Sequence, residues 1–258
     1  MKKFIIANWK MLPQTAVQAR EILARTDEFL GGLQERFEPS LVFCPPFVFL
    51  DEVATALGQS HLLHDAELGA QDIATRDEGA LTGEISGPQL AVSGVRYVIV
   101  GHSERRWTLG EDDATVNAKL TAVLRNDLVP IVCLGERERS GAWEEILRAQ
   151  ARATFHDVAP VDIARCLIAY EPVWAISTNP DARPDTPESA LKSIELLRSF
   201  FAEEFATADV RVLYGGSVNP DNAVAFLGTK GIDGVLVGGA SVRPDDFVQI
   251  LQAAIAPL

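Results

Sequence analysis

Three short apolar runs are each followed by a charged or titratable residue that could take part in proton transfer. Lys10 comes shortly after the apolar run 4–7, His102 follows the run 97–100, and Glu171 follows the run 167–170. A carboxylate can accept a proton, an imidazole can donate one, and an ammonium group can stabilise developing negative charge. Each residue alone has a plainer explanation: a solvated lysine, a structural histidine or a salt-bridged glutamate. The chemistry therefore requires a fold that brings the three runs together.

Two pairs of glycines follow the last two apolar runs, Gly215-Gly216 before Ser217 and Gly238-Gly239 before Ala240. One such pair indicates only a tight turn. Two pairs after the last two strands of an α/β barrel are typical of a phosphate site, because glycine lets backbone N–H groups approach an anion closely. We therefore expect an anion to bind in this part of the chain.

The composition favours a folded, acidic protein. Hydrophobic residues make up 47% of the 258 residues and charged residues 23%, without a polar low-complexity tract, so the chain can bury a large core. The formal net charge of -13 repels phosphates, which argues against nonspecific binding to nucleic acid or to an anionic membrane. An anionic ligand must therefore be captured by local groups.

The cysteines and the apolar segments indicate a cytoplasmic protein. Cys44, Cys133 and Cys166 form an odd set without the spacing of metal ligands, so we interpret them as small apolar residues in a reducing compartment. The first apolar stretch ends at Asn8, and no run reaches the ~20 apolar residues of a membrane helix. We expect neither a secretion signal nor a membrane span.

Short apolar runs alternate with longer amphipathic segments, the pattern of parallel strands joined by helices. Strands are predicted near residues 4–9, 41–44, 67–70, 97–100, 131–134, 167–170, 211–214 and 235–237. Helices are predicted near residues 16–30, 47–57, 88–92, 114–125, 143–155, 187–205, 220–227 and 245–254. Eight alternations of strand and helix in this length favour one α/β domain over residues 1–258, a closed (β/α)8 TIM barrel. An open doubly wound sheet is the alternative, because periodicity does not reveal closure.

Seven segments, taken in their order and spacing, resemble the triosephosphate isomerase family over essentially the whole chain. They are 7–11 (ANWKM), 82–84 (TGE), 100–106 (VGHSERR), 133–136 (CLGE), 169–176 (AYEPVWAI), 214–217 (YGGS) and 237–241 (VGGAS). The resemblance implies interconversion of dihydroxyacetone phosphate and D-glyceraldehyde 3-phosphate in glycolysis and gluconeogenesis, without a metal or an organic cofactor.

The resemblance also implies roles for individual residues. Glu171 matches the general base that moves a proton between two neighbouring carbons through an enediol(ate), and its carboxylate must be desolvated enough to act as a base. His102 matches the electrophile that polarises the carbonyl and relays hydroxyl protons. Lys10 matches a cation that supports negative charge on the substrate, and Asn8 matches an amide that contacts it. Glu104 matches a supporting carboxylate near the lysine.

The same resemblance implies a phosphate site and a partner subunit. The backbone N–H groups of Ser177, Ser217, Gly238 and Gly239 match the phosphate donors, and the Ser217 hydroxyl matches a group that holds a closed lid. The lid follows the catalytic carboxylate, and its closure excludes water and protects the intermediate from losing phosphate. The loop Leu68–Ser86 matches one that reaches into a second subunit, which implies a homodimer.

The lid and the first loop depart from the family pattern. In place of the usual Gly-Thr-Gly tip the chain has Ser177-Thr178-Asn179-Pro180-Asp181-Ala182, and Arg183-Pro184-Asp185 are added before Thr186. Asn179 tolerates left-handed backbone and the prolines fix φ, so we expect altered hinge dihedrals and a changed rate of opening. Leu12-Pro13 replaces a residue that is commonly polar, which reshapes the first loop or its dimer contact.

Three other functions agree with parts of the pattern. A homologous barrel isomerase or epimerase acting on a tetrulose phosphate would use the same three catalytic groups, with pocket size selecting the substrate. A noncatalytic binding protein is disfavoured, because binding alone does not require Glu171, His102 and Lys10 together. A nucleotide-binding open sheet is disfavoured, because no Gly-x-Gly-x-x-Gly turn follows the first strand.

Overall fold

Eight parallel strands form a closed barrel in the computed structural model, which describes residues 2–139, 141–176 and 181–255. Each strand pairs with the next along the chain, and β1 pairs with β8 to close the ring. The strands are β1 (Phe4–Asn8), β2 (Ser40–Cys44), β3 (Glu67–Ala70), β4 (Val95–Val100), β5 (Val129–Leu134), β6 (Leu167–Tyr170), β7 (Arg211–Tyr214) and β8 (Gly234–Val237). The predicted (β/α)8 TIM barrel is confirmed, and the open sheet is wrong.

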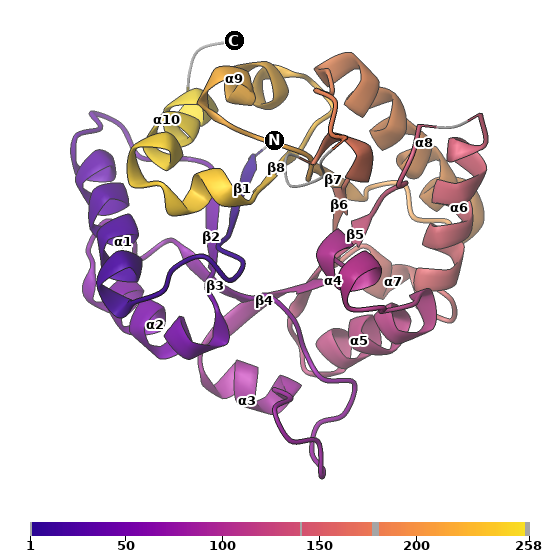
Figure 1. Ribbon diagram of the computed structural model, residues 1–258, viewed down its shortest axis with the longest axis horizontal. Helices are drawn as coiled ribbons and strands as arrows, with labels where there is room; N and C mark the ends of the chain where they lie inside the picture. The colour runs from indigo at the N-terminus through magenta and orange to yellow at the C-terminus, as the bar shows by residue number, and fades with distance from the viewer. Residues whose placement is uncertain (1, 140, 177–180, 256–258) are drawn as a thin grey trace.

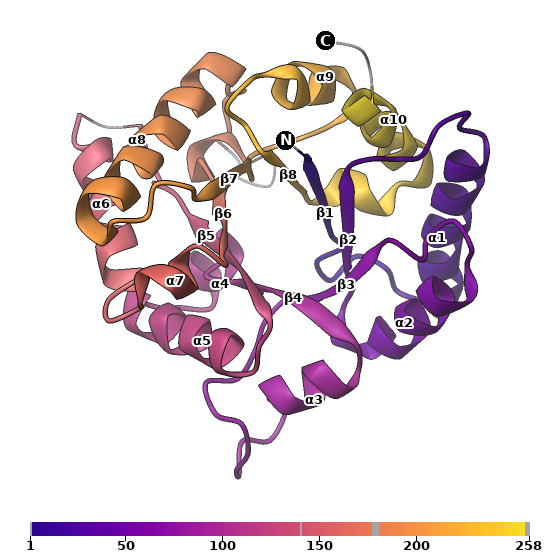
Figure 2. The ribbon, with the colours of Figure 1, turned by 180° about the vertical axis from the view of Figure 1, so that it is seen from behind.

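Helices enclose this ring of strands, as the views from its two ends show (Figures 1 and 2). The main helices are α1 (Ala16–Gly31), α2 (Leu50–Gln59), α3 (Gly87–Val92), α5 (Asp113–Arg125), α6 (Trp143–Thr154), α8 (Pro187–Phe205), α9 (Pro220–Gly228) and α10 (Pro244–Ile255). The predicted start of α8 is confirmed: the Thr186 side chain caps the helix by accepting a hydrogen bond from the Ser189 N–H at 3.2 Å, before Pro187.

Two packed layers explain why the strands are nearly continuous apolar runs. Alternate strand residues point outward against the helices or inward into the barrel, so both faces of the sheet are buried. The inner layer consists of Phe4, Ile6, Val42, Cys44, Ile99, Ile131, Cys133, Leu167, Ala169, Leu213 and Leu236. This filled interior leaves the ends of the strands as the place where a ligand can bind.

Four short elements have no counterpart in the sequence prediction. They are α4 (Ser103–Thr108), α7 (Pro160–Ile163) and the 3-10 turns η2 (Val173–Ala175) and η3 (Gly239–Val242). With three to six residues each, they are too short to show a helical period of apolar residues. Three of the four directly follow β4, β6 and β8, where they shape the end of the barrel.

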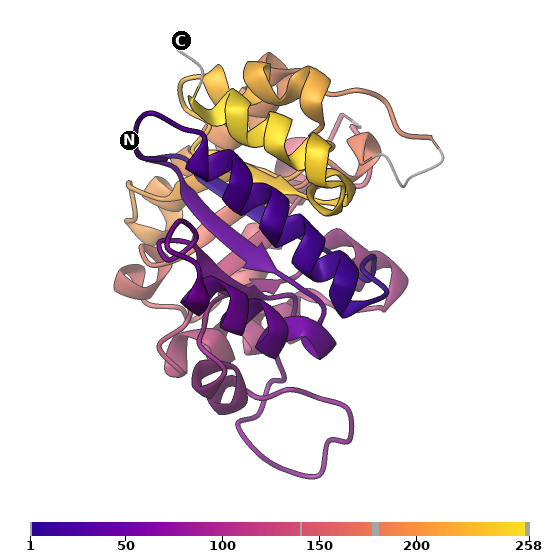
Figure 3. The same cartoon turned by 90° about the vertical axis from the view of Figure 1, so that its left-hand side faces the viewer.

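The segment between β3 and α3 projects from the barrel (Figures 1 and 3). The predicted loop Leu68–Ser86 is wrong at its start, because residues 68–70 belong to β3. Leu68, Gly69 and Ala70 are buried and pair with β4, so strand pairing fixes them. The projecting segment is therefore 71–86, and its residues 76–84 are exposed.

The cysteines are packed as apolar residues. Cys44, Cys133 and Cys166 are all buried and free of disulfide bonds, which agrees with their interpretation from the sequence. Among the described residues, no helix combines the length and the apolar character needed to cross a membrane.

Candidate active site

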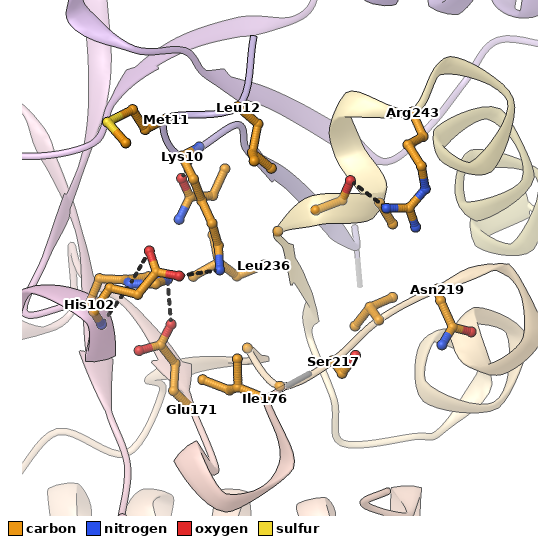
Figure 4. A pocket seen from close by; sticks show the side chains of 18 residues that line it. Lys10, Met11, Leu12, His102, Glu171, Ile176, Ser217, Asn219, Leu236 and Arg243 are labelled. Atoms are coloured by element: carbon orange, nitrogen blue, oxygen red, sulfur yellow. Dashed lines mark hydrogen bonds and ion pairs between the residues drawn. The ribbon is translucent and has the colours of Figure 1, made fainter. Parts of the chain in front are cut away.

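A cavity of about 490 Å³ lies at the carboxyl ends of the strands and brings the predicted residues together (Figure 4). Its lining residues come from the carboxyl ends of β1 and β8 and from the segments after β1, β4, β6, β7 and β8. Those that the sequence predicts are Asn8, Lys10, His102, Glu104, Glu171, Ser217, Gly238 and Gly239. Ser177, the remaining predicted phosphate donor, lies outside the described residues, as do Thr178, Asn179 and Pro180.

Glu171 is held at the end of β6 with its carboxylate in the cavity. Its backbone N–H donates to the Leu134 carbonyl at 2.8 Å, which extends the pairing of β6 with β5 by one residue. The side chain is 3% exposed. Oε2 accepts a hydrogen bond from the Ser103 N–H at 2.8 Å, and Oε1 lies 3.1 Å from His102 Nε2. The protein thus holds one carboxylate oxygen with a backbone N–H and sets the other against the imidazole.

Two glycines allow the neighbouring strand ends to pack closely against the backbone and side chain of Glu171. A Cβ on Gly135 would lie 1.7 Å from the Glu171 carbonyl oxygen, and a Cβ on Gly215 would lie 2.9 Å from Glu171 Cγ. Neither glycine has a left-handed φ, so the lack of a side chain is what matters. Glycine is required here by close packing of the strand ends around the glutamate.

His102 faces the glutamate from the start of α4. Its Nε2 lies 3.1 Å from Glu171 Oε1. On the other side of the ring, Nδ1 accepts a hydrogen bond from the Glu104 N–H at 3.2 Å, so the imidazole caps α4. An acceptor Nδ1 carries no proton, which places the proton of a neutral imidazole on Nε2, towards the cavity.

Lys10 reaches the cavity from a constrained backbone. Its φ of 54° is left-handed, which is uncommon for a residue with a side chain. The Asn8 Oδ1 accepts from the Lys10 N–H at 3.0 Å, and the Gln71 Nε2 donates to the Lys10 carbonyl at 2.8 Å. The ammonium group lies 2.6 Å from Glu104 Oε1. The predicted proximity of Glu104 and Lys10 is therefore confirmed, and Asn8 orients the lysine backbone.

The opposite side of the cavity is formed by the two glycine-rich turns. Gly238 directly precedes the 3-10 turn η3, whose first N–H groups have no carbonyl partner within the turn. A Cβ on Gly238 would lie 2.9 Å from Lys10 Cε, so the aliphatic part of the lysine side chain packs directly against the Gly238 backbone. Ser217 and Asn219 lie on the same side of the cavity in Figure 4. This arrangement offers backbone donors and a cation to an anionic group.

Buried groups that sequence analysis did not assign support the segments around Glu171. Burial, and then the negative charge of Glu171, raise the pKa of the Cys133 thiol well above its ordinary value, so this cysteine is a neutral neighbour of the carboxylate. Glu136 is completely buried, and its Oε1 accepts hydrogen bonds from Tyr170 Oη and Trp174 Nε1, both at 2.9 Å. Cys133 and Glu136 both lie in the segment 133–136 that carries the family resemblance, but neither was predicted to have a role at this site.

The added residues of the lid segment are anchored to the rest of the site. The Arg183 N–H donates to the Trp174 carbonyl at 3.0 Å, which joins the two described flanks of the lid. Asp185 Oδ1 accepts from the Thr186 N–H at 2.9 Å, while Oδ2 has no hydrogen-bond partner among the described residues. Burial is the main cause that raises the pKa of Asp185. The three extra residues thus form a tethered turn between the lid and α8.

A closed barrel with a carboxylate and an imidazole facing each other at the carboxyl ends of its strands is a (β/α)8-barrel enzyme with an acid–base site. Comparison with known proteins adds the family. A family model described as triosephosphate isomerase matches residues 3–254, and the chain belongs to the triosephosphate isomerase family.

Individual relatives agree with this assignment. The chain is 43% identical over 251 residues to the triosephosphate isomerase of Chloroflexus aurantiacus, covering 96% of this chain and 97% of the relative. It is 41% identical over 256 residues to that of Symbiobacterium thermophilum, covering 97% and 96%. A crystal structure of triosephosphate isomerase from Bartonella henselae matches with a TM-score of 0.81 and 32% identity, covering 98% of this chain and 99% of that one. The resemblance inferred from the motifs is confirmed.

Proposed function

We propose that this protein interconverts dihydroxyacetone phosphate and D-glyceraldehyde 3-phosphate through an enediol(ate), the reaction shared by glycolysis and gluconeogenesis. The observation that carries the proposal is the pair Glu171 Oε1 and His102 Nε2, 3.1 Å apart in a cavity that Lys10 also lines. A base and a hydrogen-bond donor this close can act on two adjacent atoms of one small substrate. The family to which the chain belongs supports the same reaction.

In this mechanism Glu171 is the general base. Its carboxylate removes a proton from the carbon next to the carbonyl and returns it to the neighbouring carbon. The C–H electron pair forms the C–C double bond of the enediolate as the carbonyl electrons move to oxygen. Reaching the substrate requires the carboxylate to move from the Ser103 N–H, which now holds Oε2. Burial of Glu171 keeps bulk water away from the carboxylate during the transfer.

His102 and Lys10 stabilise the negative charge that this step creates. The Nε2 proton of a neutral His102 can donate to the carbonyl oxygen and then relay a proton between the two substrate oxygens. Lys10 is a fixed cation, because Asn8 and Gln71 hold its backbone and Glu104 its ammonium group. Donors and charges fixed before the reaction stabilise an oxyanion without reorganising.

The phosphate group is assigned to the turns after β7 and β8. Support comes from the glycines that let the backbone approach a ligand at Gly238 and Gly239, and from Ser217 beside them in the cavity. Ser177 and closure of the lid over the phosphate remain predictions from the family pattern. No metal or cofactor has a part in this mechanism.

A homodimer through the projecting segment 71–86 completes the proposal. Support comes from its exposed residues 76–84, including Leu81 at 40% exposure, and from Met11 at 84% exposure beside Lys10. A contiguous patch of exposed apolar side chains is typical of a subunit interface, and these side chains would contribute to one. Light scattering should give twice the mass of one chain, and Leu81→Asp should shift it towards the monomer. Val161→Asp, on α7 at the other end of the barrel, is the control and should leave the mass unchanged.

A coupled enzyme assay tests the reaction itself. Purified protein is assayed with D-glyceraldehyde 3-phosphate and, separately, with a four-carbon ketose phosphate. Turnover of the triose phosphate and little turnover of the four-carbon substrate support the proposal. Preference for the four-carbon substrate would establish the tetrulose phosphate alternative, and no turnover of either would establish the noncatalytic one. No observation on this chain favours either alternative.

A further inference from the structure

Arg243 is a cation of the cavity to which neither the motifs nor the proposed chemistry gives a role. It follows η3 and lines the cavity on the side away from His102 and Glu171 (Figure 4). Its side chain is 58% exposed, so it stands at the rim. It shares that side of the cavity with Ser217 and Asn219.

The charges around the cavity mean that a cation at this position can affect how strongly an incoming phosphate is attracted. Among the described lining residues, the basic side chains are Lys10 and Arg243, and the carboxylates are Glu104 and Glu171. Lys10 is paired with Glu104 at 2.6 Å, so its field outside the cavity is largely cancelled. The chain as a whole carries a formal charge of -13 and repels an incoming phosphate. Arg243, which is itself paired with Asp246, is the cation at the rim of the cavity.

The contacts of Arg243 orient it towards the glycine-rich turn. Its Nη1 donates to the Gly239 carbonyl at 3.1 Å, and its Nε lies 2.5 Å from Asp246 Oδ2. Within the described part of the chain, Nη2 has no protein acceptor. A guanidinium group presents its donors as a planar fork that suits phosphate oxygens. Nη1 thus binds the glycine-rich turn, and Nη2 remains available to a ligand.

We propose that Arg243 is a phosphate-capturing residue of this cavity. It attracts the phosphate end of the substrate to the rim and holds the Gly239 carbonyl, so that the turn keeps its N–H groups in position. Asp246 moderates this attraction by neutralising part of the charge. The proposal rests on the proposed function only in taking the ligand to carry a phosphate group.

Inorganic phosphate and the triose phosphate are the probes that test this role. In Arg243→Gln, the KM for D-glyceraldehyde 3-phosphate and the inhibition constant of phosphate should both rise about fivefold at low ionic strength, with kcat changed less than twofold. The loss should shrink as salt is added. Arg243→Lys keeps the charge and should recover most of the affinity. Asp246→Asn should tighten phosphate binding, which a merely structural Arg243 does not predict.

Arg25→Gln is the matched control, because it removes the same charge from the same region outside the cavity. Arg25 pairs with Asp245, the neighbour of Asp246 in the chain, at 3.0 Å. The control should leave KM and phosphate inhibition unchanged. If Arg243→Gln and Arg25→Gln behave alike, the proposal is wrong and the effect is one of net charge.

Direct calorimetric titration with phosphate separates this proposal from the proposed reaction. Phosphate binding that is weakened by Arg243→Gln, in a protein that does not isomerise triose phosphate, overturns the reaction and supports Arg243. Isomerase activity with equal phosphate binding in both proteins overturns only the role of Arg243. A wild-type protein that neither isomerises nor binds phosphate overturns both.

Discussion

Glu171→Asp tests whether the proposed catalytic carboxylate must stand at its observed position, because it changes the reach of the side chain and keeps the carboxylate. The substitution keeps a carboxylate of similar basicity and removes one methylene group, which withdraws the oxygens by about 1.5 Å. In the wild-type protein Oε1 lies 3.1 Å from His102 Nε2, so both groups can reach one small substrate. The shortened side chain would leave a gap between base and substrate that the rigid strand end cannot close.

The expected loss follows from the sensitivity of proton transfer to distance. A misplacement of about 1 Å can cost about 10²-fold, so Glu171→Asp should lower kcat by about 10²–10³-fold, or about 3–4 kcal/mol of transition-state stabilisation. KM should change little, because the groups assigned to the phosphate lie on the other side of the cavity. Glu171→Gln removes the base altogether and should lose about 10²–10⁴-fold.

Steady-state kinetics in both reaction directions provide the measurement. Folding must be checked separately, because both variants disturb the hydrogen bond from the buried Ser103 N–H, and an unsatisfied buried donor costs about 1–3 kcal/mol. Circular dichroism and thermal melting show whether the variants are folded at the assay temperature. A folded Glu171→Asp variant that keeps more than a tenth of the wild-type kcat would refute the assignment of Glu171 as the base.

Three further predictions concern the surroundings of the carboxylate. Gly135→Ala should abolish activity and lower Tm, because its Cβ would lie 1.7 Å from the Glu171 carbonyl oxygen. Gly141→Ala is the control: its Cβ would have no neighbour within 4 Å, so activity and Tm should not change. Burial raises the pKa of Asp185, so the folded state is penalised as pH rises above the ordinary carboxyl pKa of about 3.9. Asp185→Asn should therefore raise Tm at pH 7, and the gain should disappear below about pH 4; an equal gain at every pH would contradict this. Replacing residues 177–185 by the family's shorter glycine tip should change kcat or phosphate affinity, and unchanged kinetics would count against an altered hinge.

Most of the fold can be predicted from the sequence, because a strand that is buried on both faces is a nearly continuous run of apolar residues. The predicted strands 67–70, 167–170 and 211–214 match the observed bounds, and the others differ only at their ends. Closure of the barrel is not visible in this way, since it depends on the pairing of β1 with β8 across the whole chain. Short helices such as α4 leave too few residues for a period to be recognised.

The titratable groups of the site are predictable, and the groups that hold them are not. Lys10, His102 and Glu171 stand out because polar residues follow apolar runs. By contrast, Ser103 contributes its backbone N–H to the carboxylate, and every non-proline residue has such a group. Gly135 contributes only the absence of a side chain. Neither contribution depends on a residue type that a motif would single out.

Gln71 shows how such hidden support can connect the site to the rest of the molecule. Its amide donates to the carbonyls of Lys10 and Cys44, at 2.8 and 2.9 Å, and so ties the left-handed lysine to the end of β2. Gln71 is also the first residue of the projecting segment 71–86, which the proposed homodimer would bury. A change in that segment would therefore reach Lys10 through one side chain, without passing through the barrel core. This contact gives a physical reason why the proposed activity would depend on the proposed partner subunit even though Lys10, His102 and Glu171 all belong to one chain.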